Sequence, residues 1–136
     1  MCQPSPLFFQ ADRRRKRPPK RVAHEKKRSG LSSLDRVTAR SLAAVLQAGI
    51  SNPAIANAYV DSLAAAGGDG TLEQRLPTLG TRLRGKTGTT DLACSLSGLI
   101  DRRIAFVVIE NGNPVPAWTA RTAQDRFVTV LASRTP

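Results

Sequence analysis

The sequence predicts an α+β domain with two helices, a three-stranded antiparallel sheet and a C-terminal helix that covers the sheet. Two patterns lead to this fold class. Apolar residues recur at three- and four-residue spacing near both ends of the region 29–136, which is typical of amphipathic helices. Between those segments, short apolar runs are separated by turn residues, which is typical of an antiparallel meander. Apolar residues make up 40% of the chain and aromatic residues only 4%, so the predicted core is aliphatic.

Two helices are expected before the sheet, at about residues 39–48 and 53–65. Thr38 is a suitable N-cap for the first helix, and Gly49 is a suitable residue to end it. Asn52 caps the second helix, and the proline that follows it fits the first helical turn. The apolar faces consist of Leu42, Val45 and Leu46 in the first helix and of Ile55, Tyr59 and Leu63 in the second.

Three strands are expected at residues 81–87, 93–100 and 104–111. The third is almost continuously apolar, which makes it the strongest strand prediction in the sequence. Residues 101–103 form a tight turn between the second and third strands. The three segments therefore form a meander in which neighbours in sequence are neighbours in the sheet.

A final helix is expected at residues 119–133, after a loop rich in glycine and proline. Its inward face is predicted from the spacing of its apolar side chains. The inward-facing residues are then Ala123, Phe127, Val130 and Leu131. A helix of this length can cover one face of the sheet, which completes the α+β domain.

The charge divides the chain into a basic tail, residues 1–28, and a body, residues 29–136. The tail contains ten basic and two acidic side chains, whereas the body contains eleven basic and eight acidic ones. Proline and runs of like charge oppose packing, so we predict that the tail is disordered. Such a tail could bind nucleic acid or anionic lipid, but it lacks the interleaved aromatic residues of a single-strand binder. We therefore favour a solvated tail and do not expect nucleic acid to be the partner.

The sequence indicates no metal, no cofactor and no membrane-spanning segment. Cys2, Cys94 and the single His24 are too few for a metal site or a disulfide framework. No apolar run approaches the length that spans a membrane. The apolar residues 7–9 are too short for a signal-peptide core, and positive charges follow them instead of preceding them. The compartment is therefore left open.

Lys86 is the only lysine among the eleven basic residues of the body. It begins the run Lys86-Thr87-Gly88-Thr89, beside strand-like sequence. Lysine is a compact charge on a flexible stem, whereas arginine is a planar fork. A single lysine among ten arginines therefore indicates a specific role for Lys86. The alternative interpretation is a turn with a solvated lysine, because short motifs also arise by chance.

Several motifs in order resemble one protein family. The Lys86–Thr89 run, the strand ending in Leu96-Ser97-Gly98 and the strand ending in Asn111-Gly112 resemble the third motif and sheet of penicillin-binding proteins. More narrowly, they resemble the D-alanyl-D-alanine carboxypeptidase/endopeptidase family S13. Further similar segments are Ser29-Gly30-Leu31-Ser32, Gly67-Gly68-Asp69-Gly70-Thr71-Leu72 and residues 120–126, the last as in actinobacterial members. The resemblance implies part of a penicillin-binding-protein/β-lactamase-like transpeptidase fold.

The resemblance also implies serine-type acyl transfer on peptidoglycan stem peptides. Lys86 would hold the terminal carboxylate of a D-Ala-D-Ala peptide or a β-lactam, and the Thr87 hydroxyl would bind the same carboxylate. Gly88 would allow close approach, and the Thr89 backbone N–H would form half of the oxyanion hole. The ligand would join the sheet as an added strand. Members of this family act outside the cytoplasmic membrane.

The family's nucleophile motif is not found in this sequence. No serine is followed by lysine three positions later, and no Ser-x-Asn occurs. We therefore expect residues 29–136 to be the C-terminal part of a carboxypeptidase domain without hydrolytic activity of its own. The sheet would then have an uncovered edge, which predicts self-association. Two other functions stay open: a non-catalytic binder of cell-wall peptides that uses Lys86, and a nucleic-acid-binding module that uses the basic tail.

Overall fold

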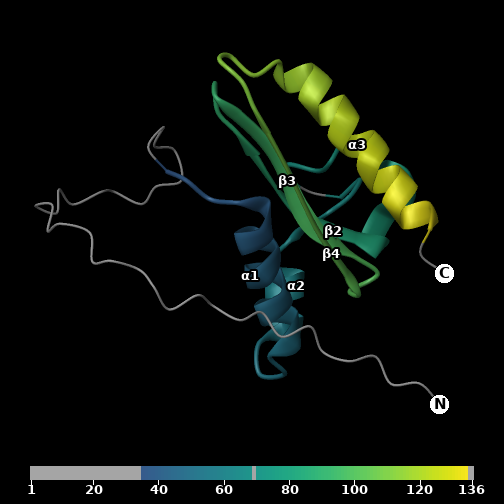
Figure 1. Ribbon diagram of the computed structural model, residues 1–136. Helices are drawn as coiled ribbons and strands as arrows, with labels where there is room; N and C mark the ends of the chain where they lie inside the picture. The colour runs from purple at the N-terminus through teal and green to yellow at the C-terminus, as the bar shows by residue number, and fades with distance from the viewer. Residues whose placement is uncertain (1–34, 69, 135–136) are drawn as a thin grey trace, which may run out of the picture.

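The computed structural model describes residues 35–68 and 70–134 and has the predicted α+β class (Figure 1). The disorder predicted for residues 1–28 lies outside the described residues. Along the chain, the elements are α1 (Ala39–Ser51), α2 (Ala56–Asp61), β1 (Ala64–Ala65), the 3-10 helix η1 (Pro77–Arg82), β2 (Leu83–Thr89), β3 (Ala93–Ile100), β4 (Ile104–Asn111) and α3 (Ala117–Ser133).

The sheet has four antiparallel strands in the order β1-β2-β3-β4, one more than predicted. β2, β3 and β4 form the predicted meander. The additional strand β1 lies where the second helix was expected to continue. Its two alanines pair with Gly85 and Arg84 of β2. Alanine favours a helix locally, and only a contact that is distant in sequence gives these residues an extended conformation.

Helices cover both faces of the sheet (Figure 1). α3 lies along one face, where the largest apolar cluster includes Leu72, Leu83, Leu96 and Val128. α1 lies on the other face against β4 and β3, and α2 packs against α1. Side chains alternate along a strand, and Leu83 belongs to the cluster under α3. The odd-numbered residues of β2 therefore face α3, and the even-numbered ones face the α1 side.

α1 and α2 meet at Gly49. Thr38 is the N-cap of α1, as predicted, because its Oγ1 accepts a hydrogen bond from the Ser41 N–H at 3.0 Å. The helix does not end at Gly49 but continues to Ser51. Gly49 is buried inside it, and a Cβ there would collide with the ring of Tyr59. The glycine therefore allows close helix packing and does not terminate the helix.

α2 is shorter than the helix predicted over residues 53–65 and spans only Ala56–Asp61. Asn52 caps a turn that precedes it, since its Oδ1 accepts a hydrogen bond from the Ala54 N–H at 3.1 Å. The far end of the predicted helix is lost because Ala64 and Ala65 pair with β2.

β2 begins two residues later than predicted and extends to Thr89. Residues 77–82, the last two of which were assigned to the strand, form η1 instead. Gly80 within η1 has φ 50° and ψ −136°, which breaks any extended run before Leu83. Pairing with β3 then continues from Leu83 through Thr89. The whole of residues 86–89 therefore belongs to one regular strand.

α3 turns a different face to the sheet from the one predicted. Its buried residues are Ala120, Gln124, Val128 and Ala132. The inward prediction is wrong for Phe127 and Val130, which are 48% and 52% exposed, and for Ala123, which is also exposed. Leu131 packs partly against the core. The prediction followed hydrophobicity, whereas the buried stripe includes small alanines that permit close approach and a glutamine that hydrogen-bonds to Arg75.

Candidate ligand-binding site

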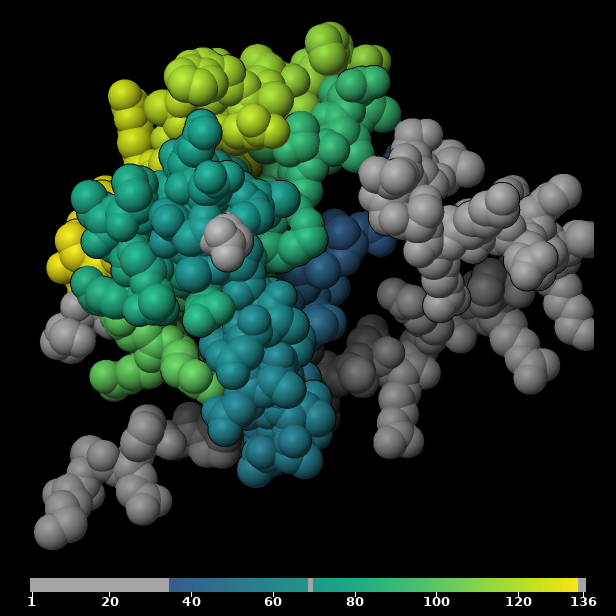
Figure 2. All heavy atoms as spheres, turned by 180° about the vertical axis from the view of Figure 1, so that it is seen from behind, coloured from purple at the N-terminus to yellow at the C-terminus, as the bar shows by residue number. Residues whose placement is uncertain are grey.

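A broad, open cleft of about 1630 Å³ lies along the outer edge of β2. All four residues of the predicted site, Lys86, Thr87, Gly88 and Thr89, line this cleft. It extends to α3 on one side and to the residues before α1 on the other. Figure 2 shows a hollow between the green surface at the end of β2 and the blue start of α1. The structure therefore brings the four predicted residues together on one concave surface.

The part of β2 that contains these residues has an edge without a partner strand. β1 pairs only with Arg84 and Gly85. Within the described residues, no strand lies beside residues 86–89 on that side. An edge of this kind presents free backbone groups that an extended peptide can pair with.

The direction of the backbone groups follows from one hydrogen bond. The Ala66 N–H donates to the Leu83 carbonyl oxygen at 3.1 Å, so Leu83 directs its backbone groups toward β1. Residues two apart in a strand direct their N–H and C=O groups to the same side. Thr87 and Thr89 therefore point their backbone groups to the unpaired edge, into the cleft.

Lys86 is exposed on the α1 side of β2, opposite Ser97 of β3. Its Nζ donates a hydrogen bond to the Thr87 carbonyl oxygen at 2.6 Å. Because that carbonyl lies at the unpaired edge, the ammonium group lies at the place where an added strand would begin to pair. A ligand anion there could replace the carbonyl oxygen as the acceptor.

Gly88 lies on the same side of β2 as Lys86, opposite Ser95. A Cβ at position 88 would be 2.7 Å from the Ser95 Oγ, which is closer than real contacts allow. A larger residue would therefore displace the Ser95 side chain or the strand. Because glycine has no side chain, nothing projects from this part of the strand, and a ligand strand can approach it closely.

Thr87 and Thr89 face the α3 side of the sheet. The Thr89 Oγ1 accepts a hydrogen bond from the Arg121 Nη2 at 3.3 Å. It also lies 4.0 Å from the Sγ of Cys94, which is buried and free. The sequence-based site did not include Arg121, because its contact with Thr89 joins two segments that are distant in sequence. No local pattern indicates such a contact.

Arg75 anchors the loop before η1 to α3. Its Nη2 lies 2.7 Å from the Asp125 Oδ1 and donates to the Gln124 Oε1 at 3.1 Å. The same nitrogen donates to the Arg121 carbonyl oxygen at 3.4 Å. These bonds fix the segment of α3 that forms one wall of the cleft. The sequence did not predict this network either.

Within residues 35–68 and 70–134, no group of three or more His, Cys, Asp or Glu residues could hold a metal ion. Over the same ranges, none of the helices combines the length and hydropathy needed to cross a membrane.

Residues 26–134 match the model of the D-Ala-D-Ala carboxypeptidase 3 (S13) family. The chain belongs to this family. The match includes β2 and all the elements that surround the cleft, so it confirms the resemblance inferred from the ordered motifs. No curated protein and no solved structure gives a significant match to this S13-family chain.

Proposed function

We propose that the cleft beside β2 binds the C-terminal D-Ala-D-Ala of peptidoglycan stem peptides, and β-lactams in the same place. The observation that carries this proposal is the unpaired edge at residues 86–89, where Thr87 and Thr89 direct their backbone groups outward. An extended peptide can pair with this edge. Membership of the S13 family supports peptidoglycan peptides as the class of ligand.

Each residue of the motif has a separate role in this proposal. The Lys86 ammonium, now on the Thr87 carbonyl oxygen, attracts the anionic end of the peptide. The Thr87 hydroxyl donates to the same carboxylate. Gly88 leaves room for the ligand backbone, and the Thr89 N–H donates a hydrogen bond to the carbonyl oxygen of the D-Ala-D-Ala peptide bond. An oxyanion hole needs such a donor. Backbone groups point to alternate sides along a strand, and those of Thr89 point to the unpaired edge of β2.

We further propose that the 136-residue chain binds this ligand without becoming acylated. Acyl transfer needs a nucleophilic serine with a lysine or another base beside it. The chain has neither Ser-x-x-Lys nor Ser-x-Asn. A labelled penicillin should therefore not become covalently attached to the purified chain. A covalent adduct detected by mass spectrometry would overturn this part of the proposal.

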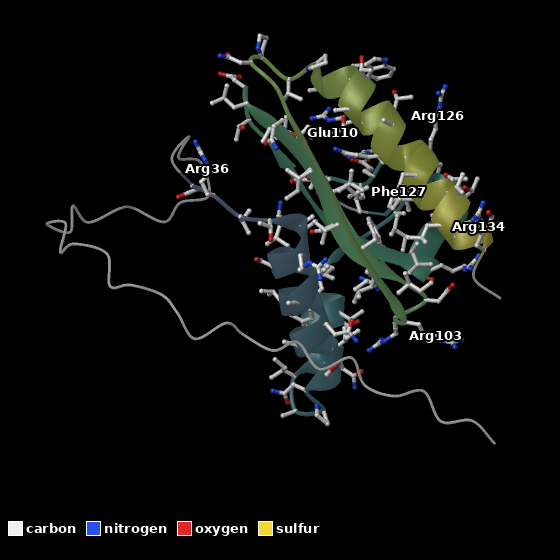
Figure 3. All side chains as sticks on the ribbon, in the orientation of Figure 1. Arg36, Arg103, Glu110, Arg126, Phe127 and Arg134 are labelled. Carbon is white, nitrogen blue, oxygen red and sulfur yellow. The ribbon has the colours of Figure 1, made fainter. Side chains whose placement is uncertain are left out.

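Titration of the ¹⁵N-labelled chain with N-acetyl-D-alanyl-D-alanine tests the binding site. We expect saturable shifts of the Thr87 and Thr89 amide signals, weaker with the L,L peptide. Lys86→Ala should weaken binding roughly tenfold, as expected for a lost charge-assisted hydrogen bond. Arg103→Ala is the matched control, since it removes an exposed cation from the far hairpin end of the sheet (Figure 3). Equal binding of both enantiomers, or no saturable shift, would contradict the proposal.

A further inference from the structure

The polar side chains of the motif lie on opposite faces of β2. Lys86 is on the α1 side, whereas Thr87 and Thr89 follow Leu83 on the α3 side. A carboxylate held by the threonine hydroxyls would therefore lie toward α3. The charged group that contacts a threonine hydroxyl there is the Arg121 guanidinium, with Nη2 3.3 Å from the Thr89 Oγ1.

Arg121 is not neutralised by an acid within the structure. Asp125 lies four residues further along α3, the spacing at which helix ion pairs form. Arg75 binds it instead, at 2.7 Å. Among the described residues, no carboxylate pairs with Arg121. No described carboxylate therefore compensates the charge of this guanidinium on the wall of the cleft.

The contact between Arg121 and Thr89 orients the hydroxyl group. Because the Thr89 Oγ1 accepts an N–H from Arg121, its own proton is available for another acceptor. A carboxylate beside both residues would receive a hydrogen bond from the hydroxyl and charge-assisted bonds from the guanidinium. A C-terminal amide has no charge. Its NH₂ group is a hydrogen-bond donor, as are the N–H groups of the guanidinium, so the two cannot bond to each other.

We propose that Arg121 is a binding and specificity residue that recognises the free terminal carboxylate of a peptide on the Thr87–Thr89 side of β2. The cleft then has two positive groups, Lys86 on the α1 side of β2 and Arg121 of α3 on the opposite side. Arg121 makes the cleft select peptides with a free C-terminus over peptides that are blocked or extended there. This inference rests on the proposed binding of D-Ala-D-Ala peptides.

The test compares N-acetyl-D-alanyl-D-alanine with its C-terminal amide on the full chain, by NMR titration. The wild-type chain should prefer the acid roughly tenfold or more, the size expected for charge-assisted hydrogen bonds. In Arg121→Gln, the acid should bind roughly tenfold more weakly while the amide is unchanged. Arg121→Lys should retain part of the preference, because it keeps the charge and loses the fork.

Arg126→Gln is the matched control, because Arg126 is exposed on the same helix and lines a separate hollow on its outer side (Figure 3). Unchanged NMR signals from the backbone N–H groups of residues distant from position 121 show that each variant is folded. If Arg121→Gln leaves the acid preference intact, this inference is overturned and the proposed function stands. If neither ligand shifts the Thr87 and Thr89 signals of the wild-type chain, both are overturned.

Discussion

Arg75 binds Asp125 through two nitrogens, with Nη2 2.7 Å and Nε 3.1 Å from the same Oδ1. The two side chains come from the loop before η1 and from α3, and they are only 12% and 31% exposed. The same guanidinium reaches the buried Gln124. This ion pair therefore holds α3, the outer wall of the cleft, against the loop before η1, and it leaves Arg121 without its nearest helical acid.

Arg75→Gln should lower the free energy of unfolding by about 2 kcal/mol, because it leaves Asp125 partly buried without its partner. Urea unfolding at pH 7 measures this change. Arg126→Gln, an exposed substitution on the same helix, should change stability by less than about 0.5 kcal/mol. Equal effects of the two variants would show that the ion pair does not stabilise the loop.

Asp101 is expected to stabilise the protein at neutral pH and not in acid. The hydrogen bonds from Arg82, at 2.9 and 2.7 Å, hold the pKa of the Asp101 carboxyl below its usual range. Stability from a lowered pKa is present above the unfolded-state value and is lost as the pH falls through the folded-state value. Asp101→Asn should therefore lower the Tm slightly at pH 7 and leave it unchanged near pH 2.

Asparagine is a matched replacement at this position because Asp101 has a φ of 51°, which asparagine tolerates well. The hairpin turn itself should therefore be kept. A Tm difference of the same size at both pH values would mean that the variant acts through the turn and not through the charge.

Gly49→Ala should destabilise the protein, although alanine is the better helix former. The added Cβ collides with the Tyr59 ring, and overpacking of this kind costs about 1–3 kcal/mol. The gain in helix propensity is only about 1 kcal/mol. In a Tyr59→Ala background the sign should reverse, so that Gly49→Ala stabilises. Denaturant unfolding of the four variants measures both effects, and the same sign in both backgrounds would rule out the ring contact as the cause.

The chain is expected to self-associate as its concentration rises. β4 is the last strand of the sheet within the described residues, so its outer edge is unpaired there. Phe127 and Val130 of α3 are half exposed on the surface. The double variant Phe127→Ser/Val130→Ser should shift the sedimentation profile toward monomer. Val45→Ser removes a similarly exposed apolar side chain from α1 and should not. A wild-type chain that stays monomeric at all concentrations would contradict this expectation.

Local patterns predicted most of the fold. The strands at 93–100 and 104–111 have the predicted bounds, and the turn between them has positive φ at Asp101 and Arg102. Thr38 caps the first helix as predicted. These features depend on residues close in sequence, such as a short apolar run or one capping hydroxyl. The sequence also predicted the family, because its motifs occur in a fixed order.

The tertiary structure decided the features that depend on distant partners. Ala64 and Ala65 are extended only because β2 lies beside them. α3 buries alanines because the sheet lies close to it, and it buries Gln124 because Arg75 donates a hydrogen bond to the amide oxygen of that residue. The same holds for the candidate site. The sequence alone placed Lys86 and Thr87 at the end of a strand, with Gly88 and Thr89 directly after it, and the structure extends that strand to Thr89. Only folding leaves one edge of that strand unpaired and brings Arg121 to Thr89, because both result from which segments meet and not from any run of residues.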